Sequence, residues 1–218
     1  MTTNLINKIN QTELINHWNK LLFLNEKSIN IVTDASTIID KTKSVAANAI
    51  ITYDTRMQEF YPMIHKPVSI KASNSSEAEL ISIALALETM RFDNQLVINR
   101  YDTINVFTDS LYCIKILRPL FNTITLANKH KSDKNLILDS LINNTEDDIG
   151  TVITYNLLWS NCVCNIFHIK AHTNNMNYII KDFIGINGIK PDTEEMTYLT
   201  SIHDMIDSIA IKTNQNII

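Results

Sequence analysis

The chain has 218 residues, a mass of 24.9 kDa and 45% hydrophobic residues, enough for the core of one domain with extensions or, at most, of two small domains. Its net charge of −4 excludes a protein that holds nucleic acid by overall positive charge, so any such role must depend on a local patch or on metal ions. The 3 cysteines argue against a disulfide framework, and no apolar run has signal-peptide or membrane-spanning length. We therefore expect a soluble protein in a reducing, cytoplasmic compartment, which would be the cytoplasm of the host cell if the protein is viral.

The first third of the chain predicts one helix and three strands. Residues 4–24 carry apolar side chains at three- and four-residue spacing, which indicates an amphipathic helix. The β-rich run "SINIVTDAS" follows and ends on Asp34. Two more strands are predicted in "VAANAIITYD" (45–54) and "RMQEFYPMIHK" (56–66), joined by a turn. Three consecutive strands predict an antiparallel meander.

Helical periodicity begins in "SNSSEAELISIALALETMRF" (73–92), where Ser and Asn residues precede the apolar positions as caps. The strand "INVFT" (104–108) comes next and ends on Asp109. A further helix is predicted from Ser110 to a point before Pro119, because proline interrupts a helix interior.

The remainder of the chain is predicted to be helical apart from one strand and one connection. Residues 120–160 have mostly helical character, and "VCNIFHIKAH" (163–172) predicts a fifth strand. The segment after it is expected to be helical except for the connection at 185–191, which contains two glycines and a proline. No repeat or linker indicates a domain boundary.

Two of the predicted strands end on acids, Asp34 and Asp109, and a helix start carries Glu77 and Glu79. Neighbouring strands lie about 4.8 Å apart, so these carboxylates could share a site for hard divalent ions, which activate water for phosphodiester hydrolysis. Each aspartate alone is equally well explained as a cap, and either glutamate as a favourable first-turn charge. Acids packed without a cation repel one another, so a cluster of them favours a functional explanation. The order of these acids along the chain, strand-Asp, two strands, helix-Glu and strand-Asp, favours a shared metal site over separate caps.

These strings resemble the ribonuclease H family, type 1. "TDAS" is similar to the family's first-strand motif and implies a catalytic Asp34, and "NSSEAEL" is similar to its catalytic helix start, which implies Glu79 instead of Glu77. "VFTDS" resembles the family's Thr-Asp-Ser strand end and implies Asp109 as the third catalytic acid. "IKAH" resembles its Lys-Gly-His segment, which implies that His172 assists proton transfer and product release.

A fourth carboxylate is implied by the family's Asn-x-x-x-Asp-x-Leu-Ala helix. "HDMIDSIA" is similar to it, with Asp207 as the ligand and His203 where the family has Asn, and requires a helical insertion at about 173–202. Asp182 is closer to the usual distance from the histidine, but its surroundings match poorly. Asp207 is therefore the favoured ligand, with Asp182 as the alternative.

The resemblance implies an α/β, RNase H-like fold with a five-stranded mixed sheet, three antiparallel strands then two parallel, and helices on both faces. We expect an N-terminal helical extension (1–27) and a catalytic domain (28–218). The implied activity is endonucleolytic hydrolysis of the RNA strand of RNA/DNA hybrids, giving 5′-phosphate products. The four carboxylates would hold two Mg²⁺ ions, for which Mn²⁺ can substitute, in a monomer that binds no membrane.

Substrate contacts are implied for the polar residues before the catalytic helix, Asn74, Ser75 and Ser76, and for Ser36, although each is equally explained as a cap or turn residue. Two serines stand where the family has larger amides. These serines, His203 and the acidic pI lend some support to a rival hypothesis, a catalytically silent module that binds nucleic acid or a partner. The intact carboxylates Asp34, Glu79 and Asp109 argue against it, because a binding module has no reason to keep them. A junction resolvase or integrase is a further alternative, whereas a proofreading exonuclease would place Asp-x-Glu on the first strand.

Overall fold

The structure is a computed structural model that describes residues 23–38, 43–93, 100–131, 133–142, 148–170 and 172–216. The helix predicted at 4–24 lies outside this part of the chain except for its last two residues. Phe23 and Leu24 are buried in the core beside the sheet, although the expected boundary assigns them to the extension. Among the helices that the structure describes, none has the length and apolar character needed to cross a membrane.

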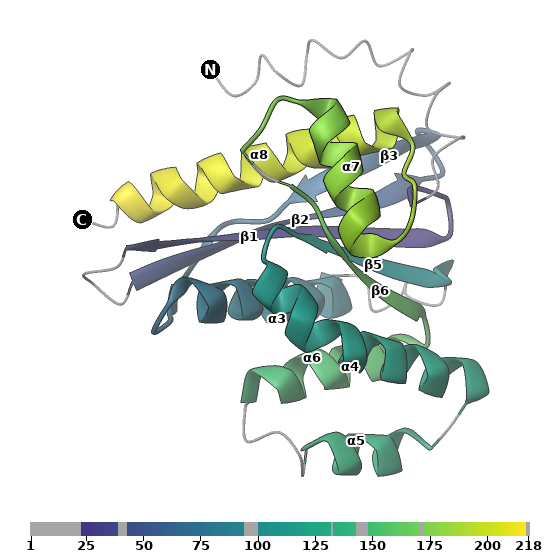
Figure 1. The fold of residues 1–218 in the computed structure, drawn as a ribbon. Helices are drawn as coiled ribbons and strands as arrows, with labels where there is room; N and C mark the ends of the chain where they lie inside the picture. Colours follow the sequence, from purple (N-terminus) through teal and green to yellow (C-terminus); the bar gives the residue numbers. More distant parts are fainter. Residues whose placement is uncertain are drawn as a thin grey trace.

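A mixed sheet forms the centre of the molecule (Figure 1). Its strands follow the order β3-β2-β1-β5-β6, and their bounds are Glu59–Ile64 (β3), Lys43–Asp54 (β2), Ser28–Ile38 (β1), Thr103–Thr108 (β5) and Val163–His168 (β6). The pairs β1–β2 and β2–β3 are antiparallel, whereas β1–β5 and β5–β6 are parallel. This is the predicted meander followed by two parallel strands.

A sixth strand, β4 (Val68–Lys71), pairs with the first part of β2 and was not predicted. It has 4 residues that are mostly exposed, so neither alternation nor an apolar run marks it in the sequence. It occupies the edge of β2 that β3 leaves open, because β3 pairs with the second half of that strand.

Helices cover both faces of the sheet (Figure 1). One face carries α3 (Ser75–Asp93), α4 (Leu111–His130) and α6 (Asp148–Ser160), with α5 (Lys134–Ile142) outside them. The other face carries α7 (Met176–Asn187) and α8 (Thr193–Asn216). These two helices occupy most of the insertion expected at 173–202.

The prediction that a helix stops before Pro119 is wrong, because α4 runs through this residue to His130. Pro119 removes the hydrogen bond to the carbonyl of Lys115, and both residues lie on the exposed face, where water can replace it. The opposite face of α4 buries apolar residues before and after the proline, which holds the helix together: Cys113, Ile114, Leu117, Phe121, Ile124 and Ala127.

The interpretation of Asp34 as the end of its strand is also wrong, because β1 continues to Ile38 and Asp34 still pairs with Ala47 of β2. The strand on the other side of β1, β5, is the one that ends near Asp34. Its pairing with β1 stops at Val32, and β5 itself ends at Thr108. Asp34 therefore lies where the sheet loses one strand, which leaves space beside its side chain.

Candidate active site

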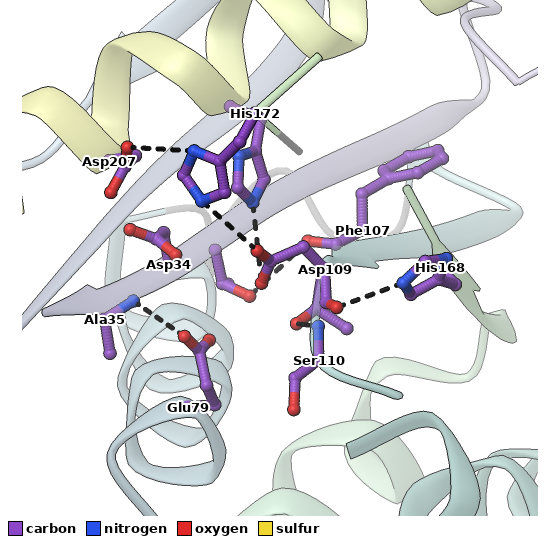
Figure 2. Close-up of polar contacts among 12 residues, drawn as sticks. Asp34, Ala35, Glu79, Phe107, Asp109, Ser110, His168, His172 and Asp207 are labelled. Carbon is purple, nitrogen blue, oxygen red and sulfur yellow. Dashed lines mark hydrogen bonds and ion pairs between the residues drawn. The ribbon is translucent and has the colours of Figure 1, made fainter. Parts of the chain in front are cut away.

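Four carboxylates from four different elements gather beside this gap (Figure 2). Asp34 comes from β1, Asp109 from the residue after β5, Glu79 from α3 and Asp207 from the middle of α8. Side chains alternate along β1, so Asp34 lies on the face covered by α8, whereas Glu79 reaches the site from the opposite face and accepts a hydrogen bond from the backbone of Ala35 at 3.2 Å. The structure thus brings together the four acids singled out in the sequence.

The two glutamates at the start of α3 have different roles. Glu77 accepts hydrogen bonds from Ser73, while its own backbone N–H donates to Asn74 Oδ1 at 2.9 Å. Asn74 is thus the N-cap of α3, and Glu77 accepts from Ser73, the residue before that cap, so both side chains hold the start of the helix. The Ser73 bonds lower the pKa of Glu77, and Glu79 alone turns toward the other carboxylates.

Burial and mutual repulsion dominate the electrostatics of the cluster. Burial, together with the charges of Asp109 and Asp207, raises the pKa of Asp34 to about 8. Burial raises the pKa of Glu79 as well, with further contributions from Asp34 and Asp109. No lysine or arginine contributes to either shift, so a bound cation would offset the repulsion that adds to both.

The donor groups present fit divalent metal ions. Asp34 Oδ2 and Glu79 Oε2 are buried and have no hydrogen-bond partner among the residues that the structure describes. Unpaired carboxylate oxygens at the same point are the ligands that hard divalent ions prefer.

A histidine stands on the solvent side of the cluster. His172 has a left-handed backbone (φ 57°), and its side chain is 66% exposed. Its Nδ1 lies 3.7 Å from Asp207 Oδ2 and its Nε2 lies 4.0 Å from Asp109 Oδ2 (Figure 2). The imidazole therefore bridges two of the acids at the mouth of the site, where a proton donor or acceptor can reach both.

A second histidine lies beneath the first. His203 of α8 is 1% exposed, and its Nε2 lies 3.9 Å from Asp109 Oδ1. Burial lowers the pKa of His203, although Asp109, Asp204 and Asp207 oppose the shift, so the neutral imidazole prevails. One donor atom each from Asp34, Asp109 and His203 all lie within 4.8 Å of one another. Sequence reasoning noted this histidine only as a replacement for Asn.

Asp182, the alternative to Asp207, lies apart from the cluster on α7. Its Oδ2 is 3.1 Å from His168 Nδ1. His168 Nε2 lies 3.0 Å from the backbone carbonyl of Asp109 (Figure 2). Burial lowers the pKa of His168, and Asp182 opposes that shift. Sequence reasoning missed His168. Its signal is its place as the last residue of β6, in register with Thr108 at the end of β5.

Two of the four residues expected to touch substrate, Ser36 and Asn74, already have intramolecular partners. Ser36 accepts hydrogen bonds from Asn214 of α8, 2.9 Å to its carbonyl and 3.3 Å to Oγ. Asn74 is the N-cap of α3, Ser75 is exposed, and Ser76 is half-buried. All four lie on elements that carry Asp34 or Glu79, so their surfaces adjoin the acid cluster.

A family model described as RNase H matches residues 25–183, more than half of the chain, and ends within α7. No curated protein matches the chain. The match includes Asp34, Glu79 and Asp109, whereas α8, with His203 and Asp207, lies beyond it. The mixed sheet with helices on both faces is consistent with an RNase H-like fold, and the chain belongs to the RNase H family, the RNase H-like nucleases.

Proposed function

We propose that the protein is an endoribonuclease that hydrolyses the RNA strand of RNA/DNA hybrids with two divalent metal ions, Mg²⁺ or Mn²⁺. The observation that carries this proposal is the meeting of four carboxylates from β1, α3, the end of β5 and α8. Burial and their mutual repulsion raise the pKa of Asp34 to about 8, and the repulsion costs stability unless cations neutralise it.

The four acids would hold the ions between them. Asp34 and Asp109 are neighbours across the gap left by β5, and Glu79 and Asp207 approach from opposite faces of the sheet. Divalent ions bound there supply positive charge that activates the attacking water and stabilises the departing 3′ oxygen. The reaction breaks the bond between phosphorus and the 3′ oxygen, and its products carry 5′-phosphate and 3′-hydroxyl ends.

His172 would move the proton that this reaction requires. Its exposed imidazole stands between Asp109 and Asp207, so it can take a proton from solvent and pass it toward the departing oxygen.

Recognition of the hybrid would depend on polar groups and the bound ions more than on overall charge. The net charge of −4 opposes attraction of a nucleic acid. Exposed Asn74 and Ser75 at the start of α3, with Ser36 on β1, offer hydrogen bonds suited to the 2′-hydroxyls that distinguish RNA from DNA.

The test is cleavage of a hybrid labelled on its RNA strand, in Mg²⁺ and in EDTA, with double-stranded RNA and DNA as control substrates. We expect cuts in the RNA of the hybrid alone, only with the metal, and none with the Asp109→Asn variant. Absence of cleavage by folded protein in both Mg²⁺ and Mn²⁺ would overturn the proposal in favour of a silent binding module. Cleavage of branched DNA instead would indicate a resolvase.

A further inference from the structure

The buried imidazole of His203 is an unusual group to find behind an acidic cluster. Its side chain is 1% exposed, and neither Nδ1 nor Nε2 has a hydrogen-bond partner in the part of the chain that the structure describes. Burying polar atoms without partners costs free energy, so such atoms in a folded protein call for an explanation. An imidazole nitrogen aimed at carboxylates has two common explanations, a hydrogen bond or a shared cation.

The distance excludes the hydrogen bond. His203 Nε2 lies 3.9 Å from Asp109 Oδ1, beyond the range of about 2.7–3.2 Å for an N–H···O bond. Two ligand atoms each about 2.0–2.2 Å from one ion lie roughly 3–4 Å apart. The separation of His203 from Asp109 falls in this range, and a carboxylate oxygen of Asp34 lies within 4.8 Å of both.

The position on α8 supports the same conclusion. His203 precedes Asp207 by one helical turn, so the two side chains project from the same face of the helix toward the sheet.

We propose that His203 Nε2 ligates one of the divalent ions of this site, together with carboxylate oxygens of Asp34 and Asp109. The inference rests on the proposed metal-dependent nuclease function and deepens it. A nitrogen ligand favours transition-metal ions, because Mg²⁺ prefers oxygen ligands and keeps several waters. The site therefore selects a divalent transition-metal ion over Mg²⁺.

Electron paramagnetic resonance of bound Mn²⁺ tests the ligand directly. In the full-length protein, we expect a ¹⁴N coupling to Mn²⁺ that disappears in His203→Asn. The matched control is His172→Asn, which removes the other nearby imidazole and should leave the coupling in place. In competition titrations, His203→Asn should lower the affinity for Mn²⁺ relative to Mg²⁺ by about tenfold or more.

A second measurement does not require the His203 variant to fold. His172→Asn protein grown with ¹⁵N-histidine should replace the ¹⁴N coupling with a ¹⁵N coupling. The proposal is overturned if bound Mn²⁺ shows no histidine coupling, or if the coupling survives in His203→Asn. It is also overturned if the protein has no Mn²⁺ site that the Asp109→Asn substitution abolishes. Hybrid cleavage in Mg²⁺ is scored separately. Cleavage without histidine coupling overturns this inference alone, and coupling without cleavage overturns the proposed nuclease alone.

Discussion

The two faces of the sheet contribute to the site in different ways. The α3 face is packed with aliphatic side chains such as Ile83, Leu87, Ile104 and Val106, and it supplies one carboxylate, Glu79. The α8 face packs the rings of Phe23, Phe107, Phe167 and Phe183 against a buried row of amides. In that row Asn105 donates to Asn30 at 2.9 Å and accepts from Asn165 at 3.0 Å.

This difference shows that the α8 face of the sheet accommodates buried polar side chains more readily than the α3 face does. On the aliphatic face, Glu79 is accommodated near the N-terminal end of α3, where it accepts a hydrogen bond from the N–H of Ala35. On the other face α8 places His203, Asp207 and Asn214 inward along one helix, and Glu195 of the same helix accepts the backbone N–H of Leu24 at 2.8 Å. The α8 face can therefore change the composition of the site without disturbing the aliphatic core.

The largest effect should come from removing the carboxylate that α8 contributes. We expect Asp207→Asn to lower kcat/KM on a labelled hybrid by about 100-fold or more, because it removes charge from the point where ions bind. Asp182→Asn is the matched control on α7, and it should cost about tenfold or less, since Asp182 acts only through His168. The reverse order of the two losses would show that α7, not α8, completes the site.

The sequence predicted the acids of β1, β5 and α3 better than the residues that α8 contributes, for a physical reason. Asp34, Glu79 and Asp109 each lie within a short string whose neighbours have local roles, such as the Asn74 cap or Ser110, which caps α4. Asp207 is held by tertiary packing of a 24-residue helix, so only its own turn carries a signal. His168 and the depth of His203 depend on strand register and burial across the sheet, which spacing in the sequence does not encode.

A smaller effect is expected on the pH dependence of stability, which the clustered carboxylates determine. In the metal-free protein, a carboxyl with a raised pKa favours folding while it is protonated and loses that contribution as the pH rises. For Asp34 the loss begins above the unfolded value of 3.8 and is complete once the pH has passed about 8. His203 has the opposite dependence, since its lowered pKa destabilises the fold only below its unfolded value of 6.5.

Between pH 6.5 and 8 we therefore expect the free energy of unfolding in EDTA to fall by about 2 kcal/mol as Asp34 ionises beside Asp109 and Asp207. Urea denaturation across this window measures the slope. Asp34→Asn, a neutral side chain of the same shape, should flatten it, and saturating Mn²⁺ should reverse it. A wild-type slope that survives in Asp34→Asn would mean that other groups carry the repulsion.

The smallest effect concerns the start of α3, where one side chain has two suggested roles. Asn74 Oδ1 caps the helix by accepting from the N–H of Glu77, and its exposed amide is also suggested to contact the hybrid. Asn74→Ala removes both functions, whereas Asn74→Ser retains a capping oxygen and removes only the amide. We expect Asn74→Ala to lower the free energy of unfolding by about 1 kcal/mol and Asn74→Ser to leave it nearly unchanged. If the amide binds substrate, KM for the hybrid rises equally in both variants. A rise in Asn74→Ala alone would assign Asn74 to the helix start and leave substrate recognition to its neighbours.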